Sequence, residues 1–544
     1  MATSDRELIF TFELDGLRSD LRVIRFEGRE AISRPFEFDI TLVGDDPGID
    51  LDAALNATAT LTLKSRDLSK SVPYRGMLAR FEQLGGVDRY YFYRATLVPR
   101  LWRAGLNLLN EIYLDEQSIP DIIRAVLERN GLRGPDVEIR LKDPSAYRSR
   151  SFTCQYQESD LAFVSRWMEQ EGLYYYFDHE AKPSGEVLAI VDYKEAQPPG
   201  AIRLRYTPPE NVQTDRQDAC VTAFTCRKTH LPGTALVQDF NYRRASLGDN
   251  LKADAPIQDG AHGQYMLYGQ NLRTEADARR LSQVRAEELA VQGTEFVGEA
   301  PAVGVRSGHF LDVESHFRAS FDARYLVTEV THRGSQAGVV LAGQNTAYNR
   351  GEQGSIYQCE FRAIESSRQY RAPRLTPRPS IDGVLSAIID AEGSGELAEL
   401  NEYGQYKVQL LYDYSEKSAN KGSSWLRMAT PYAGKYEGMH FPLLKGTEVL
   451  LAFLQGDPDQ PIILGAVPNS ETPSIIRDRN AATNGIRTVG GNTLQMIDTP
   501  GKQTITLYSP VADTMVYLGV FPDPPKEGPP SPLGDPAETL NNMS

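Results

Sequence analysis

The chain has 544 residues, of which 41% are hydrophobic and 24% are charged, so its composition excludes a largely disordered or fibrous protein. At about 100–200 residues per domain, this length predicts three or four domains. The formal net charge of −15 at pH 7 would repel the phosphates of nucleic acid and anionic lipid, so neither is an expected partner.

The N-terminal segment Met1–Phe10 carries three charged residues and no apolar core, which predicts that the chain has no secretory signal peptide and folds in the cytoplasm. The longest apolar runs fall far short of the ~20 residues of a membrane-spanning helix. Four cysteines at irregular spacing in so long a chain indicate reduced, buried thiols rather than disulfides: Cys154, Cys220, Cys226 and Cys359.

The first hundred residues contain short runs of β-branched and aromatic residues that Gly, Pro and Asp separate. This pattern predicts a β-barrel or β-sandwich. The expected strands are Leu8–Leu14, Val23–Glu27, Phe36–Val43, Thr58–Lys64, Gly76–Glu82 and Tyr90–Val98.

Two amphipathic packing helices are expected next. Ser118 is the candidate N-cap of the first helix, which ends at Asn130. The second helix runs from Ser159 to Glu171, and Gly172 is its expected stop.

A second, mostly β region extends over about Cys220–Ser366. One helix, Thr274 to about Ala290, interrupts it, and Thr274 with Asp277 has the spacing of a capping box. Three prolines then lie among basic and small residues in 371–380, a composition that resists both helix and central strand. We therefore expect a linker and a domain boundary there.

Five short strands are expected in the next hundred residues, which is the count and size of an OB-type barrel. Residues 381–470 contain twelve Asp plus Glu and six Lys plus Arg, a net charge of −6 that argues against binding of single-stranded nucleic acid. The expected strands are Gly383–Ile389, Gln405–Tyr412, Ser424–Met428, Glu448–Leu454 and Ile462–Val467.

A meander of four short strands follows, over Gly485–Val489, Thr493–Asp498, Gln503–Ser509 and Asp513–Val520. Its apolar residues alternate with mostly polar ones, so each strand presents one apolar face: Leu494, Met496, Ile505, Leu507, Val516 and Leu518. One copy offers few side chains to pack and open edges, which favours an obligate trimer that encloses three such faces in a β-prism. The alternative is that the meander packs on the preceding barrel. The proline-rich segment 521–544 is expected to be an extended tail.

Candidate metal-binding patterns are incomplete. His179 and Glu180 begin an HExxH pattern, but Pro183 replaces the second histidine and would break the helix that zinc chemistry requires. A second group has metal-ligand chemistry at a spacing that fits no standard zinc module, which favours packing residues: Cys220, Cys226 and His230.

Candidate catalytic patterns are also incomplete. Two glycine sets form neither a nucleophile elbow nor a phosphate-binding loop and are expected to be turns: Gly334 with Ser335 and Gly338, and Gly293 with Gly298. Helix faces account for the acidic residues of the two packing helices, namely Asp121, Glu128, Asp160 and Glu171. The sequence predicts no enzyme, no cofactor and no metal site.

Four long segments of the chain carry specific motifs: Tyr156–Phe177 (YQESDLAFVSRWMEQEGLYYYF), Trp425–Pro442 (WLRMATPYAGKYEGMHFP), Gly446–Pro461 (GTEVLLAFLQGDPDQP) and Asn484–Leu494 (NGIRTVGGNTL). In this order they resemble the VgrG spike proteins of type VI secretion systems, which are similar to fused hub and needle proteins of contractile phage tails. The resemblance spans nearly the whole chain.

The resemblance implies a mainly β, multidomain fold. It has two tube-type β-barrels with a helical insertion, an OB-type five-stranded barrel and a C-terminal intertwined trimeric β-helix or prism. The expected domains are 1–110 (first barrel), 111–215 (helical and mixed), 216–370 (second barrel), 371–380 (linker), 381–470 (OB-type barrel), 471–520 (trimeric spike) and 521–544 (tail).

The resemblance also implies partners: two further copies of the chain, a hexameric Hcp-type tube at the hub, a PAAR-type tip protein at the spike end, and effectors or their adaptors. The implied role is mechanical, namely puncture of a target envelope after assembly in the cytoplasm and export without a signal peptide. The segment from Val467 to Asn484 leaves no room for the lysozyme domain of phage needles. The alternative function is a scaffold with an attached hydrolase or effector activity.

Overall fold

The computed structural model describes residues 8–17, 20–114, 116–182, 185–208, 210, 220–246, 251–342, 347–349, 354–393, 396–415 and 421–520. The predicted tail, 521–544, lies outside these residues. The chain divides into two compact units. The first unit comprises Met1–Asp382, Tyr412–Glu416 and Phe453–Gln460, and the second comprises Gly383–Leu411, Lys417–Ala452 and Pro461–Ser544.

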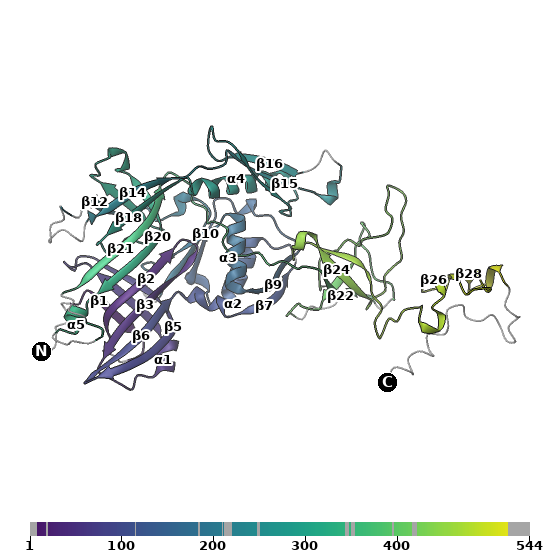
Figure 1. The fold of residues 1–544 in the computed structure, drawn as a ribbon, viewed down its shortest axis with the longest axis horizontal. Coiled ribbons are helices and arrows are strands. Elements are labelled where there is room, and N and C mark those ends of the chain that lie inside the picture. The colour runs from purple at the N-terminus through teal and green to yellow at the C-terminus, as the bar shows by residue number, and fades with distance from the viewer. Residues whose placement is uncertain are drawn as a thin grey trace. The chain divides into compact units, whose positions relative to one another are not determined.

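Strands from both predicted β regions join in one 13-stranded sheet in the first unit (Figure 1). The first region supplies β1 (Phe10–Leu14), β2 (Arg22–Ala31), β3 (Arg34–Gly44), β4 (Thr58–Lys64), β5 (Ser71–Val87) and β6 (Tyr90–Val98). The second supplies β13 (Cys220–Val221), β14 (Ala223–Lys228), β18 (Thr294–Ala300), β19 (Phe310–Glu314), β20 (Arg324–Ser335) and β21 (Ile356–Glu365). The remaining strand, β12 (Ala201–Tyr206), comes from the expected helical and mixed domain 111–215. Antiparallel pairing of β2 with β20 links the two regions, so the two expected barrels share a continuous hydrogen-bonded sheet.

The helical middle contains α2 (Ile119–Arg129) and α3 (Asp160–Glu171), which match the predicted helices. Ser118 caps α2 by accepting a hydrogen bond from the Asp121 backbone N–H, and Gly172 ends α3 at φ +80°. The accompanying strands are β7 (Leu108–Tyr113) paired with β9 (Thr153–Ser159), and a sheet of β8 (Val137–Arg140), β10 (Tyr174–Asp178) and β11 (Val187–Val191). Two short helices, α1 (Leu51–Asn56) and α5 (Ala337–Val340), also belong to the first unit.

A small α/β layer carries the third predicted helix, α4 (Glu275–Val291). Its capping box is confirmed, because the Thr274 side chain accepts from the Asp277 N–H and the Asp277 carboxylate accepts from the Thr274 N–H. Apolar residues of α4 pack on a three-stranded sheet of β15 (Thr234–Asp239), β16 (Leu251–Pro256) and β17 (Gln264–Tyr268).

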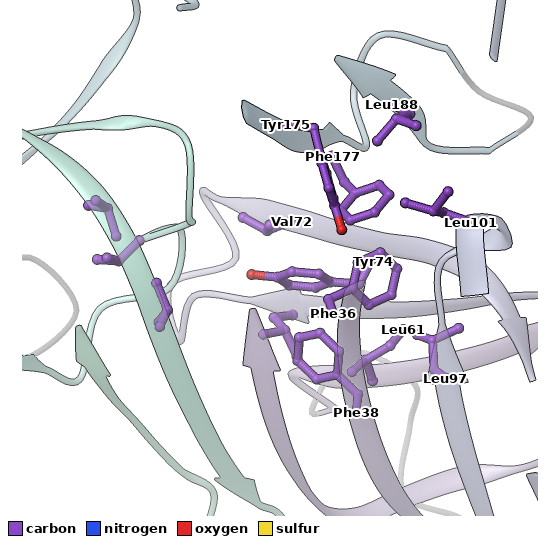
Figure 2. Close-up of a cluster of buried hydrophobic side chains, with 14 of the residues drawn as sticks. Phe36, Phe38, Leu61, Val72, Tyr74, Leu97, Leu101, Tyr175, Phe177 and Leu188 are labelled. Carbon is purple, nitrogen blue, oxygen red and sulfur yellow. The ribbon is translucent and has the colours of Figure 1, made fainter. Parts of the chain in front are cut away.

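Aromatic side chains fill the core of the first unit. Figure 2 shows Phe36, Phe38 and Tyr74 from the large sheet beneath Tyr175 and Phe177 of β10. The Phe38 and Tyr74 ring centroids lie 4.5 Å apart, and those of Phe36 and Phe177 lie 5.2 Å apart. These contacts fix the helical middle against the sheet, since buried aromatic pairs combine a large apolar area with a specific geometry.

The expectation that Gly298 and Gly334 belong to turns is wrong. Gly298 lies inside β18 and Gly334 lies inside β20. A Cβ at Gly298 would come within 2.3 Å of the Phe361 ring, and one at Gly334 within 2.2 Å of the Phe26 ring. Glycine is required at both positions because an aromatic ring occupies the space of a side chain.

The second unit contains two sheets. The first has the order β23-β22-β24-β25 and consists of β22 (Val384–Asp390), β23 (Lys407–Leu410), β24 (Glu448–Phe453) and β25 (Pro461–Ala466). The fifth segment expected for the OB-type barrel, 424–428, pairs only at single residues: Leu426 bridges to Tyr406 and Met428 bridges to Ile463. It therefore contacts residues on both sides of the barrel without forming a regular strand.

The second sheet is the predicted C-terminal meander. Its strands are β26 (Thr483–Arg487), β27 (Thr493–Ile497), β28 (Thr504–Ser509) and β29 (Thr514–Gly519). They pair consecutively and antiparallel within one chain. Below, these four strands are called the C-terminal sheet.

Candidate functional site

The register of the C-terminal sheet brings all six predicted interface residues to one face. Leu494 lies opposite Leu507, and Leu507 lies opposite Val516. In the next row, Ile505 lies opposite both Met496 and Leu518. Directly opposed residues of antiparallel strands point to the same side, so the six form two cross-strand rows. We call this side the apolar face.

Much of the apolar face is exposed within the described chain. The exposed fraction of five of the six side chains rises from 37% at Met496 to 57% at Leu518, and Leu494 is half-buried. Ile486, which lies opposite Leu494 and is 39% exposed, is a seventh member that the sequence analysis missed. Its position between Gly485 and Arg487 in a predicted strand was the available signal. Together with neighbouring residues, Ile486, Leu494, Leu507 and Val516 line a groove of about 400 Å³.

The opposite face of the C-terminal sheet is more polar and is better covered at several positions. Five of its residues have exposed fractions of 5–8%, whereas Met515 on the same face is 39% exposed. The five covered residues are Thr483, Thr493, Gln495, Thr504 and Thr506. A sheet that completed its core within its own chain would show the reverse distribution, with the apolar side buried. We therefore expect a partner to bind the apolar face of this sheet.

Buried ion pairs in the helical middle correct one expectation. Asp160 and Glu171 are not on solvated helix faces, because their side chains are 0% and 7% exposed. Asp160 accepts hydrogen bonds from Arg129, Asn130 and Gln155. Burial acts to raise the pKa of Asp160, but these hydrogen bonds outweigh it and lower the pKa. Glu171 pairs with Arg150 and Arg280, so both carboxylates are structural.

The turn after β24 is anchored within the first unit. The Cys154 backbone N–H donates to Asp459 Oδ1 at 2.6 Å, the Ile381 N–H donates to the Gly456 carbonyl at 2.9 Å, and Arg378 pairs with Asp457. Burial, followed by the Asp457 charge, raises the pKa of Asp459 to about 6. The quoted motif segment GDPDQP therefore places its two aspartates in a buried polar cluster.

The residues of the two incomplete metal-binding patterns differ in their burial. His179 is buried, its Nδ1 accepts the Arg75 backbone N–H at 3.0 Å, and Pro183 lies outside the described residues. Burial, followed by the positive charge of Arg306, holds the pKa of His179 well below its usual range. Cys220 is buried, Cys226 is half-buried and His230 is exposed. Over the described ranges, three or more His, Cys, Asp or Glu side chains nowhere gather in a metal-binding arrangement.

The helices also bear on membrane insertion. In the portion of the chain that is described, every helix is too short or too polar to cross a membrane.

Comparison with known proteins agrees with this architecture. Residues 29–338 match the family model of the phage tail baseplate hub (GPD), and residues 400–467 match that of the type VI secretion system/phage-baseplate injector OB domain. The chain is 31% identical over 518 residues to the type VI secretion system spike protein VgrG5 of Pseudomonas aeruginosa, covering 92% of this chain and 63% of that protein. It is 30% identical over 499 residues to VgrG1a of the same organism, covering 89% of this chain and 74% of that protein.

The chain belongs to the VgrG spike protein family of the type VI secretion system. Its fold also resembles the solved structure of the Escherichia coli c3393 protein, a type VI secretion component described as similar to the T4 bacteriophage tail proteins gp27 and gp5. That match has a TM-score of 0.58 and 22% identity, and it covers 84% of this chain and 100% of that one. The chain spans 62–65% of the length of the first three curated relatives.

Proposed function

We propose that this chain is a structural, non-enzymatic subunit of a trimeric spike that is mounted on a contractile tube and punctures a target envelope. The observation that carries the proposal is the C-terminal sheet, whose apolar face is largely exposed while five polar residues of the opposite face are covered. Three copies around an axis would bury three such faces together. Membership of the spike family supports this arrangement.

The proposed domains keep the boundaries expected from the sequence: barrels at 1–110 and 216–370 around a helical domain at 111–215, a linker at 371–380, the OB-type barrel at 381–470 and the spike at 471–520. Within the described residues each chain pairs its own four spike strands. Each chain would then supply a whole antiparallel sheet to one side of the prism. Intertwining of the three chains is part of the proposal.

The proposed partners follow from the family. A trimer of two-barrel subunits would offer six barrels to a hexameric Hcp-type tube, and a PAAR-type protein would cap the spike end. Effectors or their adaptors would travel with the assembly, from the cytoplasm to the outside or into a target cell. The acidic charge of the chain favours neither nucleic acid nor anionic membrane as a binding partner, so contact with the target membrane would be mechanical.

The test is the double variant Ile505→Asp with Leu507→Asp in the full chain. We expect the first unit to remain folded, the trimer to be lost and export by the secretion machinery to stop. Carboxylates at these two positions would be buried without partners at the threefold axis. Export at the wild-type level by a monomeric variant would refute the proposed role of the C-terminal sheet.

A further inference from the structure

A small cavity lies in the first unit between the C-terminus of α3 and the first turns of α4. The centre of a water-sized sphere can occupy a volume of about 20 Å³ in it, so the cavity has room for one small species. The charged and hydroxyl-bearing residues that line it are Tyr147, Arg148, Arg150, Glu171, Asp277 and Arg280. Three of these residues form the ion-pair cluster described above, namely Arg150, Glu171 and Arg280.

The lining carries an excess of positive charge. Three guanidinium groups face two carboxylates, which leaves one net positive charge. Both carboxylates are already engaged: Glu171 with Arg280 and Arg150, and Asp277 with Arg148 at 3.5 Å and with two backbone N–H groups at the start of α4. The N-terminus of α4 adds its positive dipole to this environment.

Two of these arginines also carry a side-chain nitrogen whose N–H group donates no hydrogen bond to the residues that the structure describes. Arg148 Nη1 and Arg280 Nε are buried and have no acceptor in the described part of the chain. A buried N–H without an acceptor is costly, and more so on a charged group. Burial, followed by the neighbouring charge of Arg150, lowers the pKa of Arg148 to about 9, as expected for a cation with too little negative charge around it.

We propose that this cavity is a binding site for one small inorganic anion of the size of chloride, held among Arg148, Arg150 and Arg280. Such an ion would cancel the excess charge and accept the spare N–H groups, as charge-assisted hydrogen bonds do. The narrow space for a water-sized sphere, about 20 Å³, favours a monatomic anion over sulfate or phosphate. A water molecule would accept the N–H groups but leave the charge uncancelled.

The anion would hold three elements together: the segment before β9 that carries Arg148 and Arg150, the end of α3, and the start of α4. Its binding therefore stabilises the folded first unit by mass action. This inference is independent of the proposed function, because it concerns the first unit alone.

The experiment is thermal unfolding of the full chain at constant ionic strength, with sodium gluconate replaced stepwise by sodium chloride or sodium bromide. Gluconate is too large for the cavity. We expect the unfolding temperature of the first unit to rise by about 2–3 °C and to saturate with either halide. Equal unfolding temperatures in gluconate and halide would overturn the proposal and point to water in the cavity.

Two variants give the matched comparison. Arg148→Met removes one spare donor and the excess charge, so the halide-dependent rise should disappear. Arg279→Met removes an exposed arginine of α4, 75% exposed and paired with Glu275, and should keep the full rise. If Arg148→Met does not fold, bromide-soaked crystals of the wild-type chain decide: an anomalous peak in the cavity supports the site, and its absence overturns it.

Discussion

The 13-stranded sheet of the first unit and the C-terminal sheet both consist of strands in which apolar and polar residues alternate. They differ in whether other elements of the same chain cover the apolar side. In the first unit, Phe36, Phe38 and Tyr74 are at most 1% exposed because other elements of the same unit cover them (Figure 2). In the C-terminal sheet, Leu507 and Val516 remain about half exposed, at 49% and 51%.

The difference lies in how many neighbouring elements are available to cover each sheet. The first unit surrounds its sheet with α2, α3 and β10, which bring their own apolar residues to the core. Between residues 483 and 519 the chain forms only short strands and turns. Four strands without a covering layer do not complete a core, and in the proposed trimer this cover comes from the other copies. The first unit is thus expected to be stable in one copy, and the C-terminal sheet only in an assembly.

The largest expected effect is loss of the trimer, which should depend on which face of the C-terminal sheet carries the substitution. Val516→Asp places a carboxylate on the apolar face, and three copies would bring three such charges together, so we expect complete loss of trimers. Met515→Asp alters the adjacent residue of the same strand, which lies on the opposite face and is 39% exposed, and should leave the trimer intact. Size-exclusion chromatography with light scattering measures both. Equal behaviour of the two variants would contradict the assignment of the interface to one face.

A smaller effect is expected inside the first unit. Arg129→Leu leaves the Asp160 carboxylate buried without its guanidinium partner and should lower the free energy of unfolding by ~2–4 kcal/mol. Arg124→Leu on the same helix breaks an exposed pair with Asp121 and should cost less than ~1 kcal/mol. Urea unfolding followed by circular dichroism gives both values, and neither variant should change the trimer.

The pH dependence of the first unit provides a third test. The pKa of Asp459 is about 6 in the folded state, above the unfolded value of ~3.9, so the folded state binds the proton more tightly. This residue therefore makes stability decrease as pH rises from about 4 to about 6, by an amount on the order of 1–3 kcal/mol. Asp459→Asn should remove that part of the decrease. Identical profiles of unfolding free energy against pH for the wild-type chain and Asp459→Asn would contradict the raised pKa of Asp459.

The smallest predicted effect concerns a helix cap. Ser118→Ala removes the acceptor for the Asp121 N–H and should cost about 1 kcal/mol of first-unit stability. Ser118→Asp restores an acceptor and should recover most of that loss. Thermal unfolding of the wild-type chain and the two variants tests this order of stability. Because the cap is far in sequence from the C-terminal sheet, the mass of the assembly should be the same in all three.

Local patterns predicted the elements well. The strands at 58–64 and 90–98, the N-cap at Ser118, the stop at Gly172 and the capping box of α4 all follow from short-range signals and are present in the structure. The four strands of the C-terminal sheet were also predicted from alternation and turns, and the register shows why their apolar residues share a face.

Contacts between residues far apart in the sequence could not be predicted from local patterns. The pairing of β2 with β20 joins residues about 300 positions apart, and no local pattern specifies that contact. For the same reason Asp160 and Glu171 were interpreted as surface residues: a single sequence does not show that Arg129 or Arg280 will bury and neutralise them. Gly298 and Gly334 were misread because the rings that exclude a side chain there come from other strands.

Sedimentation equilibrium of the full chain tests the central claim most directly. The account predicts a mass three times that of the 60.6 kDa chain throughout the micromolar range, since the apolar faces of the C-terminal sheet are buried only in the assembly. A folded species of 60.6 kDa that keeps its C-terminal sheet intact would contradict it.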